Sequence, residues 1–188
     1  MREIVLKGID EKIYYDKCDN GLPIYMLVND KVNNFYMTLS VKYGSIDTEF
    51  KTKDSDEYIK VSDGIAHFLE HVNFNEPDGT TAHEYFDKLG SSINAFTTFD
   101  FTCYEVFAHT EFEDNLNHLL DYVQTPYFTK EIVNNYKESL LKSHKSENTV
   151  YAYVTDVNLY IKYLTSKDIY LNESDNNTIW DGVLYDHK

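Results

Sequence analysis

A short histidine motif narrows the structural options for this chain. His67 and His71 stand four residues apart, and Glu70 directly precedes the second histidine. Residues with this spacing lie on one face of an α-helix, so both imidazoles can reach a single metal ion. Glu70 lies at the edge of that face, where its carboxylate can act on a water beside the metal. The alternative is a helix whose histidines only pack or face solvent.

The helix that carries the motif is expected over residues 64–74, where apolar residues recur at helical spacing. Before it, apolar runs at 13–15 and 23–28 flank an Asn-Gly pair at 20–21, which favours a hairpin turn. Residues 34–44 alternate between apolar and polar side chains, as in a strand that is buried on one face. Residues 49 to 57 are mostly polar, and we expect a surface loop there.

The segment after the motif alternates between helices and strands. Thr81 and Glu84 form a capping box that predicts a second helix, and Gly90 predicts its end. Residues 93–99 and 102–108 have the composition of two strands that are joined by a tight turn. A hairpin of this kind needs a helical layer to cover its apolar face.

Two further helices are expected at 112–123 and 129–141, and the tyrosine-rich segment 151–170 also favours a helix. The order of elements predicts an α+β fold, in which helices back one face of a mainly antiparallel sheet. We expect one domain over residues 1–170, followed by a polar tail at 171–188.

Composition excludes several function classes. The net charge is −15, and Arg2 is the only arginine, so a nucleic acid is not an expected partner. No apolar run has the length of a signal peptide or a membrane span, so no membrane association is expected. The two cysteines, Cys18 and Cys103, do not form a disulfide framework, which favours a cytoplasmic, reducing location.

The residues Gly-Ile-Ala-His-Phe-Leu-Glu-His at 64–71 resemble the active-site helix of the pitrilysin/insulinase zinc metallopeptidases, a family that includes mitochondrial processing peptidase. Their H-x-x-E-H order is that of the inverzincins. Other segments resemble family motifs in the same order along the chain. These segments are 20–22, 43–45, 92–97, 102–104 and 124–128.

The resemblance implies a metallopeptidase fold, a zinc ion and a role for each motif residue. His67 and His71 would be zinc ligands, together with a glutamate further along the chain. Glu70 would act as the base toward a zinc-bound water and would then protonate the leaving amine. The alternative for Glu70 is a solvated helix carboxylate.

The resemblance also implies that a peptide substrate binds as an added strand along one sheet edge. The matching residues are Asn94, Ala95, Phe96 and Thr97. Taken alone, these four residues fit an ordinary edge strand equally well.

The third zinc ligand departs from the family pattern. Ser143 and Tyr136 stand where the family has glutamates, and serine is a poor zinc ligand. Glu147 lies one helical turn beyond Ser143 on the same face, and it is the favoured replacement. His144 and Glu138 are the other candidates, although a helix would point both of them elsewhere.

The short length of the chain implies a partner. In the family, a second homologous half supplies an arginine and a tyrosine that hold the substrate, and Arg2 lies in an unrelated position. The expected function is therefore a zinc metalloendopeptidase domain that works with a larger homologous subunit as a heterodimer, or by self-association. The alternatives are a non-catalytic peptide-binding or scaffold subunit with a degenerate metal site, and a truncated product that folds poorly.

Overall fold

The computed structural model describes residues 1–6, 8, 11–51, 57–61 and 64–142. The chain divides into two compact units, of which the first ends at Asn34 and the second begins at Phe35. The helix expected at 151–170 and the polar tail expected from 171 lie outside the described residues, so the predicted domain boundary stays a prediction.

The first unit is a three-stranded antiparallel sheet, ordered β1-β2-β3. Its strands are β1 (Arg2–Leu6), β2 (Glu11–Lys17) and β3 (Pro23–Leu27). The turn between β2 and β3 is the one that the Asn-Gly pair predicts. Gly21 adopts a φ of 96°, and its N–H donates to the carbonyl of Cys18 at 2.9 Å. The sequence did not predict β1, because only three of its five residues are apolar.

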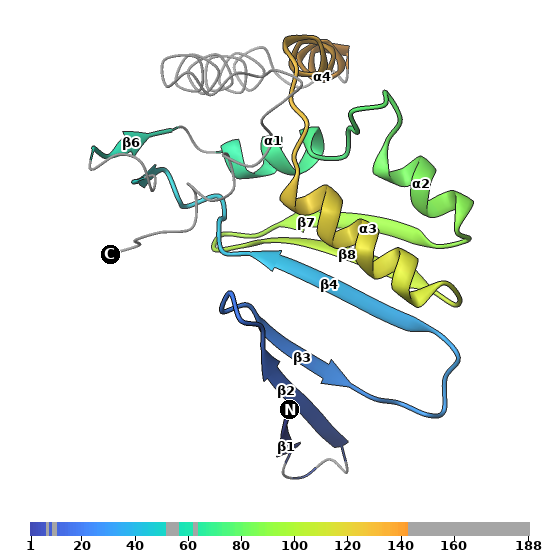
Figure 1. Ribbon diagram of the computed structural model, residues 1–188. Helices are drawn as coiled ribbons and strands as arrows, with labels where there is room; N and C mark the ends of the chain where they lie inside the picture. The colour runs from blue at the N-terminus through green and yellow to red at the C-terminus, as the bar shows by residue number, and fades with distance from the viewer. Residues whose placement is uncertain (7, 9–10, 52–56, 62–63, 143–188) are drawn as a thin grey trace. The chain divides into compact units, whose positions relative to one another are not determined.

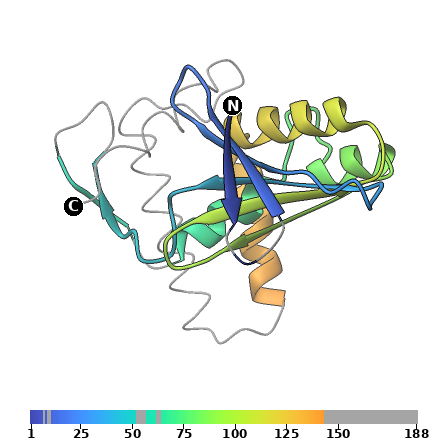
Figure 2. The same cartoon turned by 90° about the horizontal axis from the view of Figure 1, so that it is seen from below.

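The second unit contains the sheet that carries the motif helix. Its strands are β4 (Phe35–Val41), β7 (Ser92–Thr97) and β8 (Thr102–Ala108), and both neighbouring pairs are antiparallel. Their spatial order is β4-β8-β7, so β7 is an edge strand among the described residues. The view from below in Figure 2 shows these strands running alongside one another.

One face of this sheet is apolar and forms the core. The register places Tyr104 of β8 between Leu39 of β4 and Ala95 of β7, and the Tyr104 side chain is fully buried. Tyr36 and Phe96 point to the opposite face and are exposed. The strand pattern expected over 34–44 is therefore confirmed, because alternate residues of a strand face opposite sides of the sheet.

Helices cover the apolar face of this sheet (Figure 1). They are α1 (Ile65–Val72), α2 (Ala82–Lys88) and α3 (Phe112–Gln124), and a fourth helix, α4 (Lys130–Lys142), packs against α1. The predicted α+β class is confirmed. Within the described part of the chain, no helix combines the length and the apolar character that a membrane span requires.

The loop predicted over 49–57 is partly wrong. Strand β5 (Glu49–Phe50) pairs with strand β6 (Ile59–Lys60) in an antiparallel ladder. Phe50 is only 4% exposed, and its ring meets that of Tyr43 edge-on at 5.5 Å. A single buried aromatic side chain therefore anchors a segment whose other residues are mostly polar.

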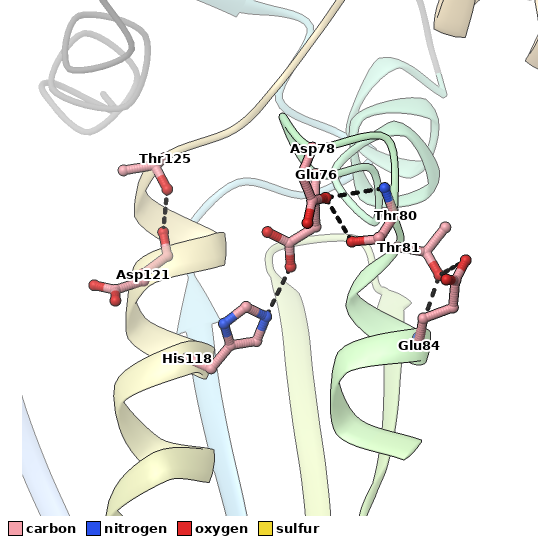
Figure 3. A network of polar contacts seen from close by, with 8 residues as sticks. All are labelled: Glu76, Asp78, Thr80, Thr81, Glu84, His118, Asp121 and Thr125. Carbon is pink, nitrogen blue, oxygen red and sulfur yellow. Dashed lines mark hydrogen bonds and ion pairs between the residues drawn. The ribbon is translucent and has the colours of Figure 1, made fainter. Parts of the chain in front are cut away.

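The connection between α1 and α2 is tied to α3 by a polar contact (Figure 3). His118 of α3 meets Glu76 of the connection at 2.7 Å, and both side chains are largely buried. The ring of Tyr85 stacks on His118 with 3.4 Å between the ring centroids. Further on, Thr81 caps α2 by accepting a hydrogen bond from the N–H of Glu84, as the capping box predicts.

Candidate metal centre

Helix α1 is built to present one polar face. Gly64 precedes the helix with a φ of 95°, a left-handed conformation that favours glycine. The side chains that face the sheet are apolar and buried, whereas His67 is half-buried and His71 is exposed. These buried apolar residues are Ile65, Ala66, Phe68, Leu69 and Val72.

The two histidines of α1 converge. Their Nε2 atoms lie 3.0 Å apart, and their ring centroids are 4.7 Å apart. Two nitrogen ligands that each lie ~2.0–2.1 Å from a tetrahedral zinc ion are separated by about 3.3 Å. The imidazole pair of His67 and His71 therefore fits a shared zinc ion with little rearrangement.

Glu70 completes the cluster from the buried side of the helix. One ligand atom from each of His67, Glu70 and His71 lies within 4.8 Å of the others. The Glu70 side chain is only 5% exposed, and its Oε2 accepts a hydrogen bond from the Thr97 hydroxyl at 2.7 Å. A buried carboxylate needs such a partner, since burial without one is costly. Glu70 is therefore not the solvated surface carboxylate of the alternative interpretation.

A short series of hydroxyl groups leads from Glu70 into the sheet. Thr97 Oγ1 lies 3.3 Å from Thr102 Oγ1, and the Thr102 hydroxyl donates to the carbonyl oxygen of Tyr43 at 2.9 Å. Thr97 and Thr102 are directly paired across β7 and β8. The sheet register therefore fixes the position of the group that holds Glu70.

A second aromatic ring reaches the cluster from α4. The Tyr136 ring centroid lies 5.1 Å from that of His71, with 33° between the planes. The same ring meets Phe68 edge-on at 5.4 Å. The sequence pattern places Tyr136 on the apolar face of the expected helix, one turn beyond Val133, as well as at a position where the family has a glutamate. It does not show which element that face meets.

The predicted substrate-binding residues all lie on β7, but they face two ways. Thr97 and Ala95 face the helices, and Thr97 contacts Glu70. Asn94 and Phe96 face the other side, where the Asn94 amide donates to Glu105 at 3.0 Å. The contact between Thr97 and Glu70 was not predicted, although strand alternation from the buried Ile93 places Thr97 on the helix side.

The third ligand is not found among the described residues. Ser143, His144 and Glu147 lie outside them, so the choice of Glu147 stays a prediction. Glu138 is exposed and pairs with Lys142 at 3.7 Å on the surface of α4. Within the described part of the chain, the motif residues form the only group of three histidine, cysteine or acidic side chains with metal-binding spacing.

The described histidines outside the motif have packing or surface roles, as expected. His83 stacks on Phe74 with 4.6 Å between the ring centroids, and His118 pairs with Glu76. His109 is exposed and meets Phe107 edge-on. None of the three is near enough to the motif to join its metal-binding group.

Two buried phenols lie behind the cluster. Burial raises the pKa of Tyr104 and Tyr122 above the ordinary value of 10.0, and the charge of Glu70 adds to both shifts. Their rings meet edge-on at 5.6 Å. Both tyrosines therefore keep their phenolic protons above the pH at which an ordinary tyrosine loses its own.

Comparisons with known sequences agree with this geometry. The model of the insulinase family, peptidase family M16, matches residues 32–167. An uncharacterized zinc protease of Bacillus subtilis, YmfH, is 41% identical over 137 residues, which are 73% of this chain and 32% of that protein. The probable zinc protease PqqL of Escherichia coli is 32% identical, over 59% of this chain and 12% of its own length.

Solved structures show the same fold. An M16-like peptidase from Alicyclobacillus acidocaldarius aligns with a TM-score of 0.66 and 30% identity, over 74% of this chain and 32% of its own. Pitrilysin aligns with a TM-score of 0.55 and 20% identity, over 73% of this chain and 15% of its own, which supports the fold alone. This chain spans about a third or less of the length of these relatives.

Proposed function

Because this chain belongs to the insulinase family of peptidases (family M16), we propose that it forms the zinc-binding part of a metalloendopeptidase. His67 and His71 are the proposed zinc ligands, and Glu70 is the proposed base. The convergence of the two Nε2 atoms to 3.0 Å, beside a buried and hydrogen-bonded carboxylate, carries this proposal. Zinc, when bound, supplies a Lewis acid that polarises the scissile carbonyl and lowers the pKa of a nearby water.

Glu70 takes a proton from the attacking water and later returns it to the leaving amine. The Thr97 hydroxyl donates to Oε2 of Glu70 at 2.7 Å and holds the carboxylate in place. The proton taken from water rests on the other carboxylate oxygen, where it stays available to the leaving amine while Thr97 keeps its hydrogen bond to Oε2. Thr102 lies 3.3 Å from Thr97 Oγ1 and donates its own hydrogen to the Tyr43 carbonyl.

The proposed substrate is an extended peptide that pairs with β7. This strand is at a sheet edge among the described residues, and its residue Thr97 contacts Glu70. A peptide that pairs through its backbone with Asn94, Ala95, Phe96 and Thr97 would add a strand to the sheet edge. One of its peptide bonds would then lie near the histidine cluster. The net charge of −15 favours basic or neutral peptides over acidic ones.

We propose that residues outside the described part of the chain complete the metal site. Glu147 is the proposed third ligand, and a larger homologous subunit, or a second copy of this chain, is the proposed partner. The support is that relatives named as zinc proteases are about three times as long as the segment they share with this chain. The proposed role of Glu147 predicts weaker zinc binding in Glu147→Ala.

Peptide hydrolysis tests the proposal. The full chain, together with any homologous subunit that co-purifies, is incubated with a mixed peptide library and zinc. We expect Glu70→Gln to lower cleavage by roughly 10²–10⁴-fold without loss of zinc, because the general base is removed. Glu84→Gln, on the exposed side of α2, is the matched control. Equal cleavage by wild type and Glu70→Gln would exclude the proposed base.

A further inference from the structure

The imidazole of His71 is exposed on the surface of α1 and packs against two rings. It contacts the His67 ring at 4.7 Å and the Tyr136 ring at 5.1 Å, both measured between centroids. His67 belongs to the same helix, whereas Tyr136 contacts His71 from α4.

Tyr136 is itself fixed by the core. Its half-buried ring meets Phe68 edge-on at 5.4 Å, and Phe68 is a buried residue of the hydrophobic core. Helix α4, which carries Tyr136, is anchored by the buried side chain of Val133. A continuous path of packed side chains therefore leads from the core through Tyr136 to the exposed His71 ring.

We propose that Tyr136 is a positioning residue for the metal centre, which holds the His71 ring in the orientation that binds zinc. This inference rests on the proposed function, because it takes His71 as a zinc ligand. Ordering a free side chain opposes binding, and a ring that is already held avoids that loss. The aromatic face of Tyr136 packs on the imidazole in a way that an aliphatic side chain cannot.

The proposed role rests on the aromatic face of Tyr136, which phenylalanine retains and leucine lacks. Tyr136→Phe should therefore keep the zinc affinity within about twofold of wild type, whereas Tyr136→Leu should weaken it roughly tenfold, as the loss of a group that orients a metal ligand does. Asn134→Ala is the control, because it changes an exposed residue of the same helix and leaves the buried Val133 anchor in place. It should leave the zinc affinity unchanged.

Competition with a chromophoric chelator measures the zinc affinity of each full-length variant, and circular dichroism confirms its fold. The absorption spectrum of the cobalt(II)-loaded protein gives an independent readout, which should change in Tyr136→Leu and not in Tyr136→Phe. If the leucine variant does not fold, Tyr136→Met removes the aromatic face while retaining a long apolar side chain.

Wild-type affinity and an unchanged cobalt spectrum in the non-aromatic variant would overturn the inference. An equal loss in Asn134→Ala would also overturn it, because the effect would then belong to α4 in general and not to the ring of Tyr136. Absence of zinc binding in the wild type would instead refute the proposed function, so the two failures can be told apart.

Discussion

Among single residues, Thr97 has the most direct link to the proposed chemistry. Its hydroxyl donates to Glu70 Oε2 at 2.7 Å. Thr97→Val keeps the shape of the side chain and removes this hydrogen bond, and we expect hydrolysis to fall about tenfold while zinc binding is retained, since a hydrogen bond to a charged group contributes ~1.5–3 kcal/mol. Thr97→Ser should restore activity. Full activity in the valine variant, measured under the same zinc loading, would contradict this role.

The buried tyrosines predict a loss of stability in alkali. Burial raises the pKa of both Tyr104 and Tyr122 above 10.0. Above that pH the unfolded chain loses phenolic protons that the folded chain keeps, so the free energy of unfolding should fall as the pH rises from about 10. Urea titrations at pH 8, 10 and 11 measure how steeply the free energy of unfolding falls with pH.

Tyr122→Phe should make that slope shallower, because one buried phenol no longer titrates. Tyr25→Phe, at an exposed position of β3, is the matched control and should leave it unchanged. Identical slopes in wild type and Tyr122→Phe would show that the Tyr122 phenol does not contribute to the pH dependence of stability.

Between elements, Gly44 lies directly against the turn that joins β7 and β8. A Cβ at Gly44 would lie 2.3 Å from the carbonyl oxygen of Phe99 and 2.4 Å from the backbone nitrogen of Asp100. Gly44→Ala should therefore push the end of β4 away from the turn and destabilise the protein by roughly 1–3 kcal/mol, the usual cost of overpacking.

Chemical denaturation measures the effect of Gly44→Ala, and Ser92→Ala on exposed β7 is the control. A free energy of unfolding equal to that of wild type would mean that the backbone shifts without cost. The need for glycine at position 44 is therefore steric and does not depend on a positive φ.

Elements with strong periodicity could be predicted, and contacts between distant elements could not. The apolar alternation of β4 and the helical pattern of α1 identify both elements, because each buries one face. The contact of Tyr136 with His71 depends on how α4 crosses α1, and the strand at Phe50 depends on one buried ring. Neither property is encoded in local spacing. The motif residues were found from sequence because their spacing lies within one helix.

For the whole molecule, zinc binding and peptide cleavage can be tested separately. The two histidines of the proposed metal site lie on one helix with Glu70, so we expect this chain to bind zinc by itself. The proposed partner subunit predicts a different result for cleavage. We expect the isolated chain to bind zinc without cleaving peptides, and addition of a larger homologous subunit to restore cleavage. Size-exclusion chromatography and peptide assays on the mixture test this, and full activity of the isolated chain would contradict it.

The zinc content of the purified protein tests the central claim most directly. The full chain is expressed without added chelator, and its metal is measured by atomic emission alongside His71→Ala and the control His83→Ala. The proposal predicts about one zinc ion per chain in wild type and in His83→Ala, and little or none in His71→Ala. Wild-type protein that lacks zinc, or zinc that persists undiminished in His71→Ala, would contradict the assignment of His67 and His71 as a metal centre.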